Sequence, residues 1–131
     1  KHYRHQNVLI SGASTTLPDY TLLNDKMAQL VDWYNSEAHK LHPIERAAKV
    51  HADFVGIHPF IDGNGRTSRL LMNLELLKAG YPPCVITVDN RLAYYEALDQ
   101  WMTYGKTETF IQLVSNAVLD GFKPYKVVLG I

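Results

Sequence analysis

The sequence contains one cysteine, no long apolar run and no excess of charge of either sign. Because Cys84 has no partner, an internal disulfide is excluded, which is typical of a reducing compartment. Thirteen lysines and arginines balance 13 aspartates and glutamates, and a nucleic-acid-binding domain needs a basic surface instead. No run approaches the roughly 18 apolar residues of a membrane-spanning helix, and no signal peptide is visible. We therefore predict a cytoplasmic protein that binds neither nucleic acid nor membrane.

The 131 residues are 47% apolar, 20% charged and 11% aromatic, as in an ordinary globular protein. A chain of this length can build one hydrophobic core. No linker, repeat or low-complexity tract divides it, so we predict a single domain over residues 1–131. The first residue is a lysine rather than a methionine, which is compatible with a fragment of a longer protein.

Apolar residues recur at three- and four-residue spacing in five segments, which indicates amphipathic helices. In the third helix, Leu70, Leu71, Leu74 and Leu77 are expected to face the core. Before the helices, a β-prone run and a turn-rich Ser-Gly-Ala-Ser stretch predict a small hairpin over residues 7–17. The pattern after residue 122 is indeterminate. The predicted fold class is all-α, a compact bundle with a small β-hairpin and helices over residues 22–35, 43–55, 64–77, 90–104 and 107–121.

Residues 58–69 read His-Pro-Phe-Ile-Asp-Gly-Asn-Gly-Arg-Thr-Ser-Arg, which places a turn directly before a helix. Gly63 and Gly65 let the backbone approach a ligand closely, and the free N–H groups of a helix N-terminus bind anions. Arg66 and Arg69 lie three residues apart on the helix, so both guanidinium groups can face the same ligand. Because planar guanidinium groups bind pairs of phosphate oxygens, these residues predict a phosphate site.

Two titratable residues complete this segment. The carboxylate of Asp62 would be repelled by phosphate unless Mg²⁺, which takes carboxylate and phosphate oxygens together, lay between them. The imidazole of His58 has an ordinary pKa of about 6.5, which suits it to accept a proton from a hydroxyl nucleophile. The segment therefore predicts a nucleotide-phosphate pocket with a general base at its edge.

Taken singly, each part of the segment has a simpler interpretation. A histidine before proline is usually a loop residue, a Gly-x-Gly turn usually delimits a helix, and two arginines usually form a solvated helix face. Their combination in one contiguous segment favours the functional interpretation. Neither a Walker A loop nor the glycine-rich loop of protein kinases is present.

The same segment resembles the full Fic motif, HxFx(D/E)GNGRxxR, without a departure. The Asn-Val-Leu-Ile-Ser-Gly stretch, the Leu-His-Pro-Ile-Glu helix start and the Ala-Gly-Tyr-Pro-Pro helix end are similar to other Fic-domain landmarks, so the resemblance covers nearly the whole chain. It implies a Fic-type helical bundle. It also implies a protein adenylyltransferase, which transfers AMP from ATP to a Ser, Thr or Tyr hydroxyl of a target protein and releases pyrophosphate.

The resemblance implies a role for each motif residue. His58 matches the general base, Phe60 matches the apolar residue that anchors the loop, and Asp62 matches the ligand of Mg²⁺. Because phosphorylating relatives carry lysine at the position of Gly65, this glycine favours AMP transfer. The residues that match the phosphate-binding groups of the family are Gly63, Asn64, Gly65, Arg66 and Arg69.

Two further regions are assigned by the resemblance alone. The predicted hairpin corresponds to a flap that docks the target protein, although a hairpin that only covers the core is an equal alternative. Tyr94 and Tyr95 lie near the adenine pocket of the family, although such pairs are also common in packing. The inhibitory (S/T)xxxE(G/N) motif of many relatives is missing, so an inhibitory helix or antitoxin is expected outside this chain. The flap residues are Val8, Leu9, Ile10, Ser11 and Gly12.

Two other functions stay open at this point. One is a Fic enzyme that transfers UMP, GMP or phosphate, and the other is a nucleotide-binding module without catalysis. An intact His58 and Asp62 argue against the module, because binding alone needs no base. We expect a bacterial cytoplasmic enzyme that uses ATP as co-substrate and Mg²⁺ as cofactor, while nothing in the sequence identifies its target.

Overall fold

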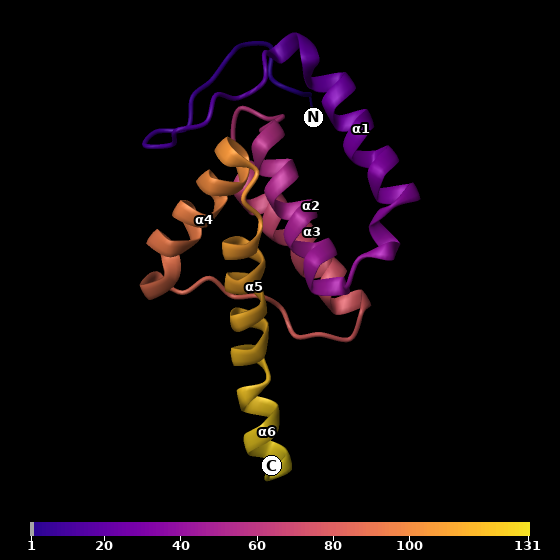
Figure 1. The fold of residues 1–131 in the computed structure, drawn as a ribbon, viewed down its shortest axis with the longest axis vertical. Coiled ribbons are helices and arrows are strands. Elements are labelled where there is room, and N and C mark those ends of the chain that lie inside the picture. The colour runs from indigo at the N-terminus through magenta and orange to yellow at the C-terminus, as the bar shows by residue number, and fades with distance from the viewer. Residues whose placement is uncertain (1) are drawn as a thin grey trace.

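The computed structural model describes residues 2–131, and helices dominate this part of the chain (Figure 1). Short 3-10 helices cover Tyr20–Leu22, Ala38–Lys40 and Val88–Asn90. All five predicted helices are present with closely matching ends, and the all-α fold class is confirmed. The α-helices are α1 (Leu23–Ser36), α2 (Pro43–Ile57), α3 (Asn64–Lys78), α4 (Arg91–Tyr104), α5 (Glu108–Gly121) and α6 (Lys123–Leu129).

Helix α2 lies at the centre and contacts α1, α3, α4 and α5. It begins with Pro43, whose fixed φ suits the first turn of a helix. Nδ1 of His42 accepts a hydrogen bond from the Ile44 N–H at 3.1 Å and thereby caps the first turn. Small side chains on α2 let the neighbouring helices approach closely. The fully buried apolar residues of the core around α2 are Ala47, Ala48, Ala52, Met72, Leu76, Ala97, Phe110 and Val114.

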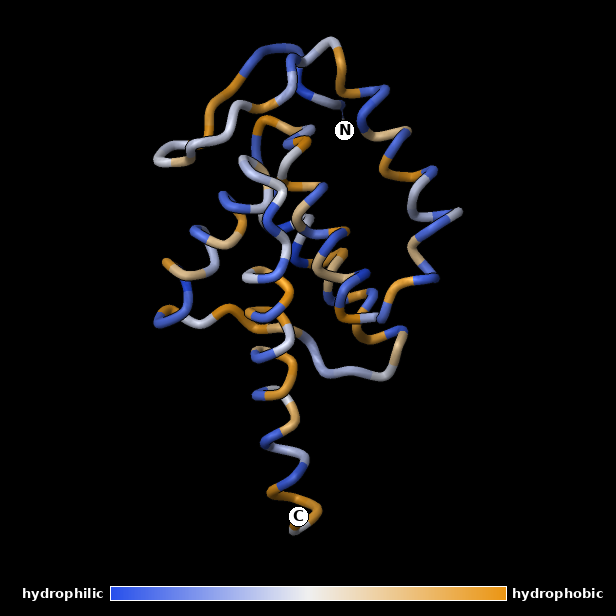
Figure 2. The backbone as a smooth tube through the Cα atoms, viewed as in Figure 1, coloured by the Kyte–Doolittle hydropathy of each residue, from blue (hydrophilic) through white to orange (hydrophobic). Residues whose placement is uncertain are grey.

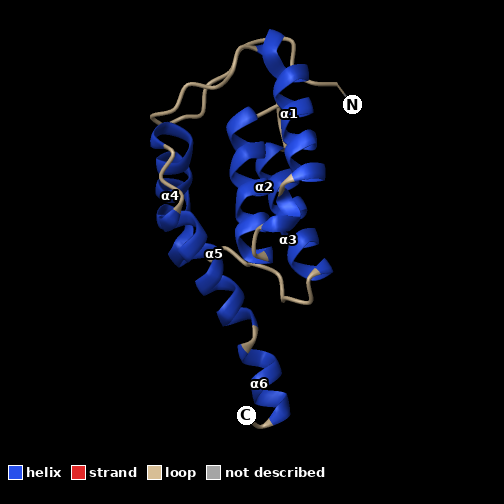
Figure 3. Cartoon of the chain, turned by 45° about the vertical axis from the view of Figure 1, so that its right-hand side comes forward, coloured by secondary structure: helices blue, strands red, loops and turns tan. Residues whose placement is uncertain are grey.

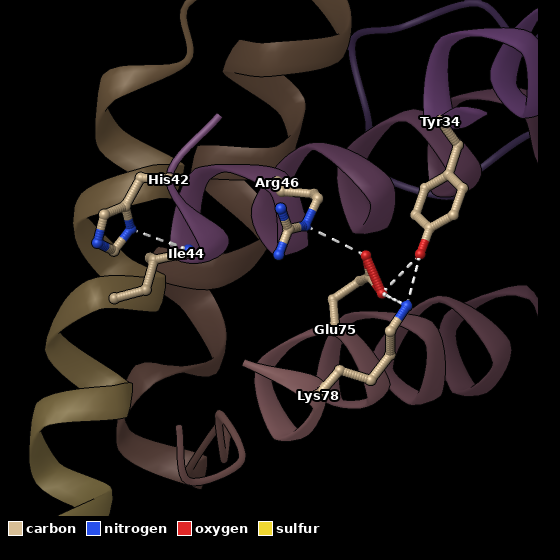
Figure 4. Close-up of polar contacts among 6 residues, drawn as sticks. All are labelled: Tyr34, His42, Ile44, Arg46, Glu75 and Lys78. Carbon is tan, nitrogen blue, oxygen red and sulfur yellow. Dashed lines mark hydrogen bonds and ion pairs between the residues drawn. The ribbon is translucent and has the colours of Figure 1, made fainter. Parts of the chain in front are cut away.

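A buried carboxylate joins α1, α2 and α3 (Figure 4). Glu75 of α3 is 5% exposed. Its Oε2 accepts hydrogen bonds from the Tyr34 hydroxyl of α1 at 2.9 Å and from Lys78 at 3.0 Å. Its Oε1 lies 3.3 Å from Nε of Arg46 on α2. Because a buried charge is costly without partners, these contacts determine how the three helices pack at this end of the bundle.

The predicted β-hairpin over residues 7–17 is wrong as a pair of strands. Figure 3 shows the segment before α1 as loop, with no strand in the described part of the chain. The Ala13 N–H bonds the Ile10 carbonyl at 3.2 Å across the turn, but the Ser14 N–H donates instead to Oδ1 of Asp99 on α4 at 2.9 Å. A turn without Asn-Gly sets no strand register. The residues expected in the flap lie in this loop: Val8, Leu9, Ile10, Ser11 and Gly12.

The prediction that the leucines of α3 face the core is also wrong, because the buried face lies on another side of the helix. Leu70, Leu74 and Leu77 are 61%, 47% and 56% exposed. The buried face carries polar residues, because Ser68 bonds the Gly65 carbonyl at 2.8 Å and Glu75 has the partners described above. A periodicity based on apolar residues alone therefore points to the wrong side of this helix. The face that is buried consists of Asn64, Ser68, Met72, Glu75 and Leu76.

Helix α6 follows α5 and extends beyond the bundle in both ribbon views. Its apolar end, visible in Figure 2, includes Val127 and Val128, which are 80% and 85% exposed. The sequence pattern predicts no element there. None of the helices in residues 2–131 combines the length and the apolar character needed to cross a bilayer.

Candidate active site

The motif segment begins at the loop between α2 and α3, where the chain reverses direction. Helix α2 ends at His58, whose N–H donates to the Phe54 carbonyl at 2.9 Å. The backbone φ of His58 is +53°, and within residues 2–131 it is the one residue other than glycine with a positive φ. A bulky residue in this conformation is strained, and such strain is concentrated at functional sites. The chain reversal thus places the imidazole at the mouth of the loop.

The ring of His58 is half-buried, and burial together with the nearby charge of Arg4 lowers its pKa below the ordinary value. The Val55 carbonyl raises the pKa of His58, but by less than these two effects lower it. Nδ1 is buried without a hydrogen bond of standard geometry among the described residues. A neutral ring whose Nδ1 carries the proton towards the Val55 carbonyl leaves the lone pair on Nε2. The arrangement therefore suits His58 to accept a proton at neutral pH.

The loop is held in shape by Asn64, the first residue of α3, which is 3% exposed. Its Oδ1 accepts the Phe60 N–H at 2.9 Å, and its Nδ2 donates to the Phe60 carbonyl at 2.7 Å. The Phe60 ring packs near Phe54 and Tyr3, with centroid distances of 6.2 and 5.9 Å. The Asn64 side chain is therefore occupied within the loop, and only its backbone is available to a ligand.

The N-terminus of α3 has no side-chain cap. Gly63 precedes it with a φ of +83°, a conformation that glycine adopts without strain. The first N–H groups of a helix have no partner within the helix and carry a partial positive charge. Next to them, the Asp62 side chain is 92% exposed, and its Oδ1 accepts the Gly63 N–H at 2.8 Å. The turn thus presents backbone donors and one carboxylate on the same surface.

The two motif arginines have different surroundings. Arg66 is 76% exposed, and its Nη2 lies 3.7 Å from Oδ2 of Asp62. Arg69 is half-buried and lies against Gly65, where an added Cβ would come within 3.2 Å of its Nη1. Gly65 therefore gives Arg69 the space that it occupies. Because guanidinium groups bind phosphate oxygens in pairs, Arg66 offers an exposed contact and Arg69 a half-buried one.

Arg69 also lines a pocket of about 430 Å³ between α3, the segment 84–86 and the start of α4. Asn73 shapes one wall, because its Oδ1 accepts the Cys84 N–H at 2.9 Å. Tyr95 lies on the rim and is 56% exposed, whereas Tyr94 is only 3% exposed and packs into the core. The lining residues are Arg69, Asn73, Cys84, Val85, Ile86, Arg91, Tyr94 and Tyr95.

The structure thus brings together some of the predicted residues and separates others. Arg69, Tyr94 and Tyr95 meet at one pocket, but Tyr94 presents little surface to a ligand. The flap residues do not line this pocket. Sequence reasoning assigns no role in the site to Asn73 or to His51. His51 is a polar residue on the otherwise apolar face of α2, so the hydropathy pattern of this helix could have singled it out.

The residues at the turn also fit the divalent cation that the motif implies. No cluster of three or more histidine, cysteine or acidic side chains occurs in residues 2–131. Asp62 nevertheless offers an exposed carboxylate, beside backbone N–H groups that suit the phosphates rather than the cation. Mg²⁺ commonly takes one or two carboxylates and completes its shell with phosphate oxygens and water. A single carboxylate is therefore a sufficient protein ligand when phosphates are bound.

Comparison with known proteins places this geometry in a family. The family model described as Fic/DOC family matches residues 1–76. The chain belongs to the Fic/DOC family. This Fic domain is 44% identical over 114 residues to the protein adenylyltransferase Fic of Nematostella vectensis, an alignment that covers 86% of this chain and 26% of the relative. It is 43% identical over 96 residues to the protein adenylyltransferase fic-1 of Caenorhabditis briggsae, with 72% of this chain and 18% of the relative covered.

The fold of the Fic domain agrees with that of a solved relative. Fic-1 of C. elegans (residues 134–508) has a TM-score of 0.85 and 34% identity, over 98% of this chain and 37% of that one. The resemblance to the Fic family is confirmed. This chain spans about a quarter or less of the length of these curated relatives, which are animal proteins. They lend no support to the expected bacterial source.

Proposed function

We propose that this Fic domain transfers AMP from ATP to a hydroxyl group of a target protein and releases pyrophosphate. The observation that carries the proposal is the arrangement of the turn: a half-buried neutral His58 begins the turn that ends at an uncapped helix N-terminus. Two arginines follow on that helix. The curated relatives cited above, named as protein adenylyltransferases, support the same reaction.

His58 acts as the general base in this reaction. Its Nε2 accepts the proton of the target hydroxyl as the hydroxyl oxygen attacks the α-phosphorus of ATP. The bond between the α-phosphorus and the oxygen that bridges to the β-phosphate breaks, and pyrophosphate leaves with that oxygen. A lowered pKa keeps Nε2 unprotonated at neutral pH, so the base is ready before the target binds.

The N-terminus of α3 and the two arginines bind the phosphates. The backbone N–H groups after Gly63 face the developing negative charge without reorganisation. Arg69 binds from its fixed place against Gly65, and Arg66 closes from solvent. Asp62 would hold Mg²⁺, which when bound supplies positive charge between the carboxylate and the phosphates.

The pocket beside Arg69 accepts the rest of the nucleotide. The exposed ring of Tyr95 offers an aromatic surface for the adenine, while the buried Tyr94 supports it from below, with ring centroids 5.1 Å apart. Arg91 lines the same pocket. Adenine binding at Tyr95 rests on this exposure and on the position of the pocket next to Arg69.

The loop at Val8–Gly12 docks the target. Its base is fixed by Asn7, whose Nδ2 donates to Oδ1 of Asp19 at 2.8 Å and whose Oδ1 accepts the Tyr20 N–H at 2.9 Å. Leu9, shortly before the turn at Ser11 and Gly12, is 87% exposed. A loop with a fixed base and unpaired extended backbone can capture an extended segment of another protein by main-chain hydrogen bonds.

The proposal is tested by incorporation of label from α-phosphate-labelled ATP into protein acceptors of a cell lysate. His58→Ala should lower the rate about 10²–10⁴-fold, while the Kd for ATP changes less than about twofold. His39→Ala removes an exposed histidine and serves as the matched control. Equal labelling by His58→Ala and the unaltered chain would refute the assignment of the base.

A further inference from the structure

A second histidine, unused by the proposed reaction, lies in the core behind the pocket. His51 of α2 is completely buried, and its ring stacks on Phe110 at a centroid distance of 5.3 Å. Its Nε2 lies 2.7 Å from the Tyr94 hydroxyl. Burial lowers the pKa of His51 to about 4, so its ring is neutral at neutral pH. Two apolar residues would fill the space of His51 and the Tyr94 hydroxyl without the cost of burying polar groups. Packing alone therefore does not explain this polar pair.

The Tyr94 hydroxyl lies between this histidine and the pocket that Arg69 lines. Tyr94 and Arg69 line the same pocket, and burial raises the pKa of Tyr94 to about 12 while a contact with Arg69 acts in the opposite direction. A guanidinium group only donates hydrogen bonds. Within the shared pocket the Tyr94 oxygen can therefore only accept from Arg69, which leaves the single proton of the hydroxyl for Nε2 of His51, 2.7 Å away. This requires the His51 proton on Nδ1, which faces the Ser68 carbonyl without a hydrogen bond of standard geometry among the described residues.

Arg69 is thus confined on two sides. Gly65 lies under its guanidinium group, where a Cβ would approach Nη1 to 3.2 Å. Tyr94 faces it from α4, held by His51 of α2. A free arginine side chain has many rotamers, and holding one of them before the ligand arrives removes the entropy cost of ordering it on binding.

We propose that Tyr94 and His51 are positioning residues that hold Arg69 in the orientation in which it binds the phosphates beyond the α-phosphate. This inference rests on the proposed function, because it takes Arg69 as a phosphate ligand. Tyr94 is then not a wall of the adenine pocket. The Tyr94 hydroxyl and His51 act on nucleotide binding through Arg69, apart from the packing of the Tyr94 ring under Tyr95, and they touch no reacting atom.

The test compares the Kd values for ATP and AMP in Tyr94→Phe, which keeps the ring and removes the hydroxyl. The expected result is a five- to tenfold weaker affinity for ATP, on the order of one hydrogen bond, and an AMP affinity changed less than about twofold. In an Arg69→Ala background, Tyr94→Phe should add no further loss for ATP. A merely structural role of Tyr94 would weaken both nucleotides and would add to the loss caused by Arg69→Ala.

Variants at His51 provide a second route that does not depend on Tyr94→Phe. A glutamine amide reaches the place of Nε2 and an asparagine amide the place of Nδ1, so His51→Gln should retain most of the ATP affinity and His51→Asn should lose it as Tyr94→Phe does. Tyr104→Phe removes an exposed hydroxyl from the same helix, and it should leave both Kd values unchanged.

The outcomes separate this inference from the proposed function. If Arg69→Ala weakens ATP binding while Tyr94→Phe leaves it unchanged, or weakens ATP and AMP equally, the positioning role is refuted and the phosphate site stands. If Arg69→Ala itself leaves the ATP affinity unchanged, the phosphate site of the proposed function fails, and the positioning role fails with it.

Discussion

Arg4 donates a hydrogen bond from Nε to the backbone carbonyl of His58 at 2.8 Å. The backbone N–H of Arg4 also donates to the neighbouring Pro59 carbonyl at 2.8 Å. Although it is charged, Arg4 is only 3% exposed. Its other guanidinium nitrogens donate to the carbonyls of Gln6 at 2.9 Å and Pro18 at 2.7 Å. One side chain therefore links the N-terminal loop to the residue that we propose as the base.

Replacement of Arg4 by alanine should destabilise the domain. Three carbonyl groups would lose a charged donor, and hydrogen bonds to charged groups contribute about 1.5–3 kcal/mol each. We expect the free energy of unfolding to fall by about 2–4 kcal/mol in denaturant titrations. Lys123→Ala, which removes a surface ion pair, should change it by less than about 0.5 kcal/mol. A similarly small effect of Arg4→Ala would show that these bonds do not hold the loop.

The activity should be lost when His58 becomes protonated at low pH. Burial first, and then the charge of Arg4, lower its pKa below the ordinary 6.5. Because the base must be neutral, kcat/KM should be constant at neutral pH and decrease only as the pH falls through this lowered pKa. NMR titration of the ring should give the same value. An acidic limb of the pH profile centred above 6.5 would contradict this account of the base.

Asn64 should affect the activity through the shape of the loop. Asn64→Ala removes both hydrogen bonds to Phe60 and leaves two loop backbone groups without partners. We expect a loss of about 2 kcal/mol in stability and a loss of AMP transfer of more than about tenfold, because the base and the helix N-terminus would no longer be held together. Asn24→Ala, at an exposed position of α1, is the matched control. Full transfer activity in Asn64→Ala would mean that the loop keeps its shape without these bonds.

Gly65→Ala should separate stability from nucleotide binding. Alanine at this helical position favours the helix by about 0.5–1 kcal/mol, so the thermal midpoint should be unchanged or higher. The new Cβ would displace the Arg69 guanidinium, and the Kd for ATP should rise several-fold. Gly56→Ala, on α2 with an ordinary contact to Met102 at 3.5 Å, should leave the Kd unchanged. Unchanged ATP affinity in Gly65→Ala would show that Arg69 binds equally well from another place.

The helices were predictable because each carries a local signal. Pro43 marks the start of α2, and the pattern of apolar residues in α1 and α5 is regular. The hairpin was not predictable, because the Ser14 N–H bonds a side chain of α4 that is distant in sequence. The phase of α3 was missed for a similar reason: Glu75 is buried only because Tyr34 and Arg46 reach it from other helices.

In the candidate site, too, the residues of one contiguous segment were predictable, whereas contacts from distant parts of the sequence were not. The motif lies within one segment, so its loop, its glycines and the family could be predicted from the sequence. The surroundings of Arg69 could not, because Tyr94 of α4 lines the same pocket and is bonded to His51 of α2. The tyrosine pair suggested an adenine pocket, whereas the contacts bury one ring and expose the other.

The most direct test of the central claim is a paired assay with ATP labelled at either the α- or the γ-phosphate, with His58→Ala measured in parallel. The account predicts that protein retains label from the α-phosphate and none from the γ-phosphate, and that this labelling is lost in His58→Ala. Label retained from the γ-phosphate would mean phosphoryl transfer, and it would contradict both the proposed reaction and the significance given to Gly65.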